Sequence, residues 1–507
     1  MFVSGLSAQS ADVDSGVLAV QKALNAGDLA AASNLIASQL AAHPTSAALL
    51  NLRGVVHAQR NELPDARSDF ERAVQLSPAL TPGWQNLARA CQIQADANES
   101  ALPCAIAAWQ RVLTQKQGDA EALLSLATLF HKEDRYSESL AQVERLPASE
   151  RTNINARLLR CADLAALGKM PEANKIASDL AAEPKLSEED FLGFRTSWEK
   201  PAAAPVVITL VKALDARNAA TINSLRLLGV AYERQQQIAE ARSTLERVAI
   251  LDPSNPAHLI ELARLAELTN DHEGALGYLG HAREVSPGEA QIHFLFAMVS
   301  MKLNLPVEAR SSLEKALAID PRNPAYNYAM GFVILSTREA ATAAEYFKHF
   351  VEARPAEPKG HYALGIADFA SGDWEHAKAE MELVEHNPST SGGAEYFLGR
   401  IARLQDQLDA SEQHLKSSIQ LLPGFAESHT ELARVYLRQN NLDAANAELK
   451  KALALDPQSF PANEQLLVIY RRTHDARSEA QAELLKKLDE DRSKRAELML
   501  RTIEVRP

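Results

Sequence analysis

The sequence is poor in the residues that most other fold classes need. Glycine accounts for only 21 of 507 residues and aromatic residues for 6%, whereas alanine and leucine are abundant. That balance suits the packing of helices through small residues and argues against sheets and against disorder. We therefore predict an all-helical protein.

Positive charge and long apolar runs are also missing. The net charge is −13, which argues against non-specific binding of nucleic acid because such binding needs a basic surface. No stretch approaches the roughly 18 apolar residues of a membrane-spanning helix. We expect neither a nucleic-acid partner nor a transmembrane segment.

Motifs of catalysis and metal binding are absent as well. The sequence has no HExxH, CxxC, Walker, GxGxxG or GxSxG segment, and the repeats described below leave no compact domain for a catalytic site. His293, His361 and His429 share one repeat position, but consecutive ones lie two repeats apart, so we interpret them as structural or solvated. We predict no enzymatic activity, no cofactor and no metal site.

What the sequence does contain is an internal period of about 34 residues. Prolines recur at this spacing, and small residues stand in phase twelve and twenty-four residues before them. Two small residues twelve apart, each inside a helical apolar pattern, are what two antiparallel helices need where their backbones approach most closely. Each period therefore predicts one pair of helices that ends at a proline. The prolines in one phase are Pro253, Pro287, Pro321, Pro355, Pro423 and Pro457, and Pro44 and Pro78 show the same spacing near the N-terminus.

The phased residues resemble the signature of the tetratricopeptide repeat family, which places an aromatic residue, Leu-Gly, Tyr, Ala, Phe and a closing Pro within about 34 residues. The copies that begin at Ile222 (LRLLGVAY) and at Ala426 (HTELARVY) match it closely. The resemblance implies an α-solenoid, a right-handed superhelix of about fourteen antiparallel helix pairs. It also implies a concave groove, lined by the first helix of each pair, in which family members hold extended peptides or partner helices.

The repeats divide the chain into five predicted segments. In order, these are 1–12, a flexible N-terminus or the remnant of a signal peptide; 13–186, an N-terminal stack with an insertion near 96–103; 187–221, a degenerate helix pair and candidate hinge; 222–475, a regular C-terminal stack; and 476–507, the last helix with a capping tail. The first residues end in a small-residue run but lack a basic start and a full apolar segment. We expect a cytoplasmic protein or, if an upstream signal peptide has been cut off, a periplasmic or secreted one.

Two of the three cysteines flank the insertion. Cys91 and Cys104 lie on the two helices of one predicted pair, where a disulfide would tie an unusually long loop. Such a bridge would make sense only in an oxidising compartment. Two unlinked thiols are the alternative, because two cysteines alone are weak evidence for a bridge.

Apolar side chains follow one face of the first helices in four consecutive repeats. The position just after the family's first aromatic site reads Phe294, Tyr328, Tyr362 and Tyr396. Contact with a ligand is one role for such a stripe, and packing between adjacent helices is the other. The candidate apolar binding residues are Phe294, Met298, Tyr328, Phe332, Tyr362, Ile366 and Tyr396.

Corresponding positions of the next repeats carry arginine, which makes a local basic cluster in an acidic protein. Arg400 with Arg403, and Arg434 with Arg438, share a helix face because they are three or four residues apart. Their guanidinium groups could hold a carboxylate through charged hydrogen bonds. Alternatively, arginines late in a helix complement its negative end, which accounts for Arg403 and Arg438 but not for the mid-helix Arg400 and Arg434.

These patterns predict a non-enzymatic scaffold or adaptor that binds a protein segment in the groove of the C-terminal repeats. We expect a protein or peptide ligand with apolar residues against 294–396 and acidic residues against the arginines at 400–438. The alternative is a regulatory or substrate-recruiting subunit of an enzyme, or of an envelope assembly or secretion complex. Nothing in the sequence predicts an oligomeric state.

Overall fold

The computed structural model describes residues 11–490, and within this range the chain is helical with no strand. The parts of the predicted N-terminal and C-terminal segments at 1–10 and 491–507 lie outside the described residues. The described part of the chain holds no helix with both the length and the apolar character that crossing a membrane requires. The prediction of an all-α architecture is confirmed.

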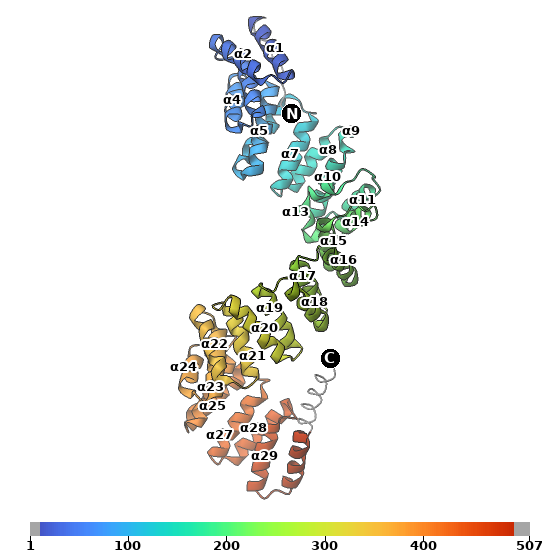
Figure 1. Cartoon of the computed structure of the whole chain (residues 1–507). Helices are drawn as coiled ribbons and strands as arrows, with labels where there is room; N and C mark the ends of the chain where they lie inside the picture. Colours follow the sequence, from blue (N-terminus) through green and yellow to red (C-terminus); the bar gives the residue numbers. More distant parts are fainter. Residues whose placement is uncertain (1–10, 491–507) are drawn as a thin grey trace. The chain divides into compact units, whose positions relative to one another are not determined.

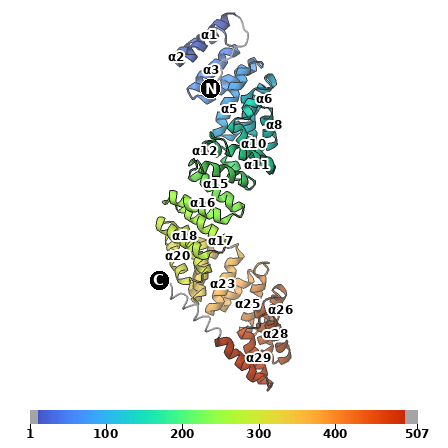
Figure 2. The same cartoon turned by 90° about the vertical axis from the view of Figure 1, so that its right-hand side faces the viewer.

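The chain divides into two compact units, one ending at Pro253 and the other beginning at Ser254. In each unit consecutive helices pair side by side, and the pairs stack in chain order (Figures 1 and 2). The elements of the first unit are α1 (Ala11–Asn25), α2 (Leu29–Ala42), α3 (Ala47–Gln59), α4 (Leu63–Leu76), α5 (Thr81–Ala97), η1 (Glu99–Ala101), α6 (Leu102–Gln115), α7 (Ala120–Lys132), α8 (Tyr136–Arg145), α9 (Ala148–Arg151), α10 (Ile154–Ala166), α11 (Met170–Ala181), α12 (Glu188–Leu192), α13 (Arg195–Trp198), η2 (Pro201–Ala203), α14 (Ala204–Asp215), α15 (Ile222–Arg234) and α16 (Ile238–Leu251).

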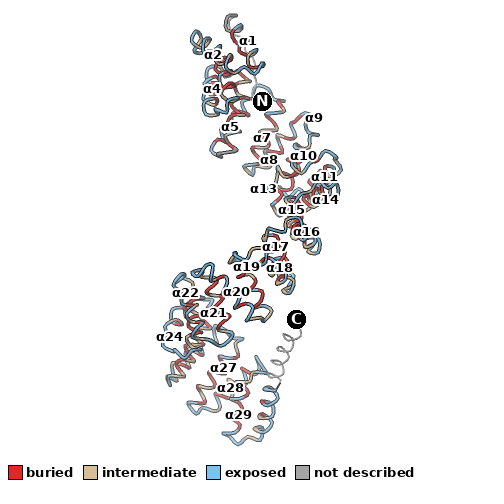
Figure 3. Tube along the Cα trace, in the orientation of Figure 1, coloured by how far each residue is buried: buried red, intermediate tan, exposed pale blue. Residues whose placement is uncertain are grey.

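The second unit is the more regular of the two, because its helix pairs follow the repeat period closely. Its elements are α17 (Pro256–Leu268), α18 (His272–Val285), α19 (Ala290–Lys302), α20 (Pro306–Ile319), α21 (Pro324–Ser336), α22 (Ala340–Ala353), α23 (Pro358–Ser371), α24 (Trp374–Glu382), α25 (Ser391–Leu404), α26 (Leu408–Leu421), α27 (Ala426–Arg438), α28 (Leu442–Leu455) and α29 (Phe460–Arg472). In both units the buried residues lie along the helix sides that face neighbouring helices (Figure 3).

Small residues occupy the points of closest approach between paired helices, as the repeat period predicts. A Cβ atom added at Gly331 of α21 would lie 2.7 Å from the Phe347 ring of α22, and one at Gly399 of α25 would lie 2.7 Å from Leu415 of α26. Ala309, at the small position of a second helix, has no exposed surface. Larger side chains are therefore excluded at these positions.

A residue with left-handed backbone conformation links the two helices of most pairs. Asn270, Asn304 and Asn440 have φ of 56°, 57° and 59°, and Gly372 has φ of 90°. Asparagine and glycine adopt this conformation more readily than other residues. These positions differ by whole repeat periods, so the turn recurs with the helices; Arg338, with φ of 67°, is an unusual residue type at this place.

The segment at 187–221 departs from the regular pairs. In place of one full first helix it has the short helices α12 and α13 and the 3-10 turn η2, before the longer α14. Pro201 and Pro205 lie around η2, where proline opposes a continuous helix. Phe191 and Trp198 stack with their ring centroids 5.5 Å apart and both are buried. The segment thus has its own small core, and its role as a hinge stays a prediction.

One buried histidine joins this segment to the preceding helices. His131 of α7 has Nδ1 2.6 Å from Asp163 Oδ1 of α10 and Nε2 2.6 Å from Ser197 Oγ of α13. Burial raises the pKa of the Asp163 carboxyl, and the hydrogen bond with His131 acts in the opposite direction. Serine, histidine and aspartate follow one another as in a hydrolase triad, but Ser197 and His131 are buried in the packed interface. We interpret the network as an anchor for the degenerate segment.

The described part of the C-terminal segment is a helix over 478–490 that packs against α29. Gln481 Nε2 donates hydrogen bonds to the side-chain oxygen of Asn463 at 2.8 Å and to its backbone oxygen at 3.2 Å. Leu485, one turn further on, is buried. This helix stands where the second helix of the last pair is expected, and the capping role of the tail remains a prediction.

Candidate functional site

A pocket of about 600 Å³ opens on the first helices α19 and α21 of the second unit. Four of the candidate apolar residues line it together: Phe294, Met298, Tyr328 and Phe332. Helical spacing brings them to one side, because residues three or four apart share a helix face. Met298 is 40% exposed and Phe332 is 56% exposed, so both present apolar surface to a ligand.

Tyr328 forms an aromatic wall of this pocket, hereafter the aromatic pocket. Its ring centroid lies 5.0 Å from that of Phe350 and 5.6 Å from that of Phe347, both on α22. Lys359 Nζ lies 5.5 Å from the Tyr328 centroid and 5.3 Å from the Phe350 centroid, within range of a cation–π contact. Tyr328 therefore takes part both in packing between helices and in the pocket lining.

The rim of the aromatic pocket carries positive charge. Among the described residues that line the pocket, Lys302, Arg354 and Lys359 are charged and none is acidic. Lys302 pairs with Glu267, while Arg354 and Lys359 lie 2.6 Å and 2.9 Å from Glu357. The three cations are about half exposed at their side chains, so they remain accessible to an acidic ligand. The sequence did not identify these three cations as pocket residues, because lysine and arginine are common at helix ends and in turns.

The remaining candidate apolar residues pack between helices. Tyr362 and Ile366 of α23 contact the buried cluster of α24 and α25, and burial raises the pKa of the Tyr362 hydroxyl. Tyr396 of α25 is 9% exposed, with its ring centroid 5.1 Å from that of Phe425. Burial raises the pKa of Tyr396 to about 12, against a smaller opposing effect of Arg400. For these three residues the packing role accounts for the observed contacts.

Three of the four candidate arginines converge on one buried carboxylate. Glu431 of α27 is 3% exposed. Arg434 Nη1 lies 2.6 Å from its Oε1, Arg403 Nε lies 3.0 Å from its Oε2, and Arg400 Nε lies 3.8 Å from its Oε1. The fourth, Arg438, lies 3.5 Å from Asp406. We call Arg400, Arg403 and Arg434 the arginine cluster.

Aromatic rings hold Arg400 from the other side. Its guanidinium carbon lies 4.4 Å from the Phe369 centroid, 5.2 Å from that of Tyr396 and 5.7 Å from that of Phe397. Each guanidinium group carries five N–H donors. The three arginines together therefore offer more donors than the carboxylate of Glu431 can accept. The arginine cluster is therefore prearranged, and it retains hydrogen-bonding capacity for a further anion.

The aromatic pocket and the arginine cluster use equivalent places in successive repeats. Each residue of the series Met298, Phe332, Ile366, Arg400 and Arg434 stands one repeat period after the previous one. All five lie on first helices, α19, α21, α23, α25 and α27. One series of positions thus changes from apolar to basic along the second unit. A ligand that follows these helices would meet apolar surface first and guanidinium groups next.

The buried carboxylate of Glu431 could have been recognised from its repeat position in the sequence. The equivalent residues one and two periods earlier are Phe397 and Ala363. A charged residue at a position that is apolar in the two preceding repeats predicts a buried carboxylate, which needs charged partners. Arginines on two neighbouring first helices supply them.

Histidine and glutamate pair across three consecutive helix pairs, which sequence reasoning also missed. His361 of α23 lies 2.6 Å from Glu380 of α24, and His429 of α27 lies 2.6 Å from Glu448 of α28. In the repeat between them the residue types are exchanged: Glu395 stands on α25 and His414 on α26, 2.7 Å apart. In all three pairs the histidine and the glutamate are 19 residues apart, and this constant separation could have revealed them in the sequence. The pair joins the two helices of each hairpin, whichever helix holds the histidine.

Among residues 11–490, one trio offers metal-type ligands close together. Ligand atoms of His57, Glu62 and Asp65 lie within 4.8 Å of one another at the turn between α3 and α4. His57 Nδ1 already lies 2.6 Å from Glu62, and its Nε2 lies 3.7 Å from Asp69. Ion pairing accounts for these contacts, and the absence of a metal site stays a prediction.

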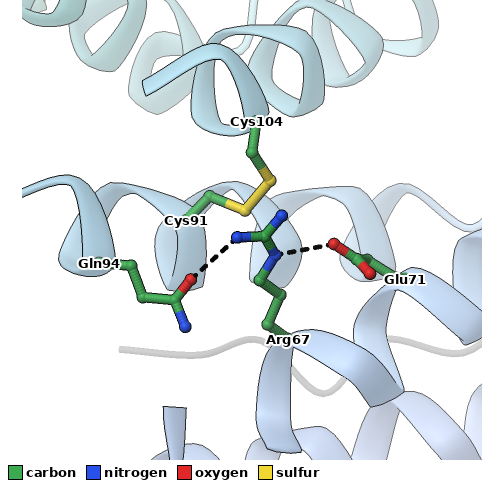
Figure 4. Close-up of a disulfide and its surroundings, with 5 residues drawn as sticks. All are labelled: Arg67, Glu71, Cys91, Gln94 and Cys104. Atoms are coloured by element: carbon green, nitrogen blue, oxygen red, sulfur yellow. Dashed lines mark hydrogen bonds and ion pairs between the residues drawn. A yellow bond between two sulfur atoms is a disulfide. The ribbon is translucent and has the colours of Figure 1, made fainter. Parts of the chain in front are cut away.

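Cys91 of α5 and Cys104 of α6 are joined by a disulfide (Figure 4). Their Cα atoms are 5.8 Å apart, and the bridge closes the insertion that contains η1. Arg67 of α4 lies beside the sulfur atoms; its Nε donates to Glu71 at 2.7 Å and its Nη1 to Gln94 at 3.2 Å. The geometry agrees with the bridged alternative.

Three segments of the chain match models of the tetratricopeptide repeat. Residues 17–80 and 226–290 match one such model, and residues 402–467 match another. Each segment spans about two repeat periods. The match at 402–467 covers α26, α27 and α28 in full but only the end of α25, so it includes Arg403 and Arg434 and not Arg400.

The chain is also similar to individual proteins. A curated relative, the BBSome complex member bbs-4 of Caenorhabditis elegans, is 26% identical over 170 residues, 33% of this chain. The chain spans only 37% of that relative's length. A crystal structure of a tetratricopeptide repeat protein from Parabacteroides merdae is 13% identical, with a TM-score of 0.39 over 49% of this chain and 98% of that chain. Yeast Tom70 is 15% identical, with a TM-score of 0.32 over 91% of this chain and 99% of that chain.

Proposed function

Since this chain is a tetratricopeptide repeat protein, we propose that it is a non-enzymatic scaffold which binds a segment of another protein along the first helices of its second unit. The observation that carries the proposal is the aromatic pocket, in which Met298 and Phe332 leave apolar side chains exposed. Exposure of this apolar surface to water is unfavourable. A partner that covers it therefore lowers the free energy of the system.

The charges around the pocket favour an acidic segment. Lys302, Arg354 and Lys359 surround the apolar surface, and the arginine cluster continues the same series of repeat positions. In a protein with a net charge of −13, such a local excess of cations would attract carboxylates while the rest of the surface repels them. We therefore expect a large apolar side chain of the ligand in the aromatic pocket and acidic side chains at the cations.

A second function is membership of a multiprotein complex as a regulatory or substrate-recruiting subunit. The observation that favours it is the similarity to a protein described as a BBSome complex member. Both functions use the same surface, but they differ in what is bound. A partner that brings an enzymatic activity with it during purification would favour the subunit role, whereas a bare peptide ligand would favour the adaptor role.

Site-specific photo-crosslinking in the native cells tests the location of the binding site. A photoreactive residue would replace Met298 in the pocket and, as a matched control, Val307, which is 74% exposed on the second helix α20. We expect crosslinks to one partner from position 298 and none to that partner from position 307. Equal labelling from both positions would place the partner elsewhere.

A charge substitution in the pocket measures the contribution of its apolar surface. Phe332→Glu should leave the fold intact, because the side chain is 56% exposed, yet should weaken partner binding by about tenfold or more. Val307→Glu, an equally drastic change at an exposed site, should bind like the wild type. Circular dichroism would verify that both variants are folded, and unchanged binding of Phe332→Glu would refute the pocket as the site.

A further inference from the structure

A second pocket, of about 500 Å³, lies among α18, α19 and α20 and shares no lining residue with the aromatic pocket. We call it the α18–α20 pocket. Its polar lining consists of Arg283, Glu284, His293 and Lys315, and Pro287 and Ile319 add apolar surface. The pocket is built mainly on second helices, so the ligand segment proposed above does not need it.

Arg283 occupies a place where neighbouring repeats have apolar residues. The equivalent residues one period before and one period after it are Ala249 and Leu317, and Leu317 packs against the core of the second unit. The guanidinium carbon of Arg283 lies 3.3 Å from the centroid of the Phe296 ring, so the side chain takes over this packing role. A cation thus stands at a position where the fold itself requires only an apolar side chain.

The guanidinium group of Arg283 forms no close ion pair within residues 11–490. Its Nη1 donates to the buried hydroxyl of Ser312 at 2.9 Å, its Nε is buried without a hydrogen-bond partner, and it forms no ion pair with the described residues. Burial lowers the pKa of the guanidinium, although the nearby Glu284 acts in the opposite direction. Removing a charged group from water without a partner is costly, so a ligand that supplied the missing charge would be bound favourably.

Two further groups in the lining suit the same kind of ligand. Lys315 of α20 is exposed and makes no ion pair with the described part of the chain. His293 Nε2 donates to the backbone oxygen of Pro287 at 2.9 Å, which leaves Nδ1, buried and without a partner, as an acceptor in the neutral ring or a donor in the charged ring. With Glu284 as the acidic group of the lining, two permanent cations outnumber one anion.

We propose that the α18–α20 pocket binds an oxyanionic group, a phosphate or a carboxylate, through Arg283 and Lys315. Guanidinium and ammonium groups are the side chains that bind both kinds of oxyanion through charged hydrogen bonds. The apolar surface of Pro287 and Ile319 leaves room for a carbon skeleton next to the anionic group. This site is independent of the proposed groove function and would stand if that function failed.

Calorimetric titration of the full chain tests the proposal with two simple probes. Sodium phosphate and sodium acetate would be titrated separately at constant ionic strength, balanced with sodium chloride. We expect saturable binding of at least one probe. Arg283→Met, which keeps a long apolar side chain against Phe296, should weaken it about tenfold or more, and Lys315→Gln should weaken it severalfold.

Matched controls separate a specific site from a general charge effect. Arg310→Gln, on the same helix as Lys315 but outside the pocket and paired with Glu314 and Glu339, should bind like the wild type. Binding of phosphate alone would assign the site to phosphate groups, and binding of both probes would show that a carboxylate suffices.

The proposal would be overturned if neither probe bound saturably, or if both pocket variants bound like the wild type; Arg283 would then be a purely structural cation. Lys315→Gln decides the outcome if Arg283→Met does not fold, because Lys315 is exposed.

Discussion

Glu431 lies between arginines of two neighbouring first helices, with Arg434 Nη1 2.6 Å from its Oε1 and Arg403 Nε 3.0 Å from its Oε2. Replacing it by glutamine would leave these guanidinium groups partly buried without their anion. We expect Glu431→Gln to lower the free energy of unfolding by about 1 to 3 kcal/mol, less than for a fully buried pair because the arginines are partly exposed. Urea denaturation would measure the loss, and Glu314→Gln, at an exposed pair, should show almost none.

Two glycines in second-unit helices should respond to alanine in opposite ways. A methyl group at Gly331 would lie 2.7 Å from the Phe347 ring, whereas one at Gly277 would meet nothing within 4 Å. We expect Gly331→Ala to lower the midpoint of thermal unfolding, because overpacking costs about 1 to 3 kcal/mol. Gly277→Ala should raise it, because alanine is favoured over glycine in a helix by about 0.5 to 1 kcal/mol. Equal shifts in both variants would contradict the close contact.

The disulfide predicts a dependence of stability on redox conditions. Cys91 and Cys104 are separated by 13 positions, and closing a loop of this length stabilises a protein by about 3 kcal/mol in the chain-entropy estimate. Non-reducing mass spectrometry of protein from its native source would reveal the bridge directly. If it is present, dithiothreitol should lower the unfolding midpoint of the wild type and leave the double variant Cys91→Ala/Cys104→Ala unchanged. Free thiols in the native protein would favour the unlinked alternative.

We expect the stability of the fold to depend on pH through Asp368 of α23. Burial, helped by the negative charges of Asp373 and Glu380, raises its pKa from 3.8 to about 6. The folded state therefore holds a proton that the unfolded state has already lost, so stability falls as the pH rises from about 4 to about 6. Asp368→Asn should be more stable than the wild type at pH 7 by about 1 kcal/mol, a value reduced for partial exposure, and nearly equal to it below pH 4. A difference that does not change with pH would contradict this assignment.

The regular part of the fold could be predicted from the sequence because its signals repeat. The copies expected to begin at Ile222 and Ala426 do so, as α15 and α27, and small residues such as Gly331 lie at the helix contacts as expected. The segment at 187–221 could be recognised only as a weak pair. Its division into α12, α13 and η2 depends on prolines and on the stacking of Phe191 with Trp198, which no period encodes.

The sequence could predict which positions form the candidate site, but not whether each residue there lines a pocket or packs between helices. Tyr328 and Tyr396 are equivalent in the sequence, yet Tyr328 lines a pocket whereas Tyr396 is buried against Phe425. The difference arises from the residues that neighbouring helices supply, and a single repeat does not contain that information. Similarly, Arg403 appeared to suit a helix end, but its partner is Glu431 in the next repeat.

Single helices of the last regular repeats are not interchangeable, because histidine stands on the first helix at His361 and on the second at His414. A chimaera that joined α23 to α26 would bring these two histidines together. One that joined α25 to α24 would set Glu395 against Glu380, two carboxylates in a half-buried place. Whole hairpins avoid both clashes. The hairpin, rather than the helix, is therefore the module that can be duplicated, transferred or recombined in this array.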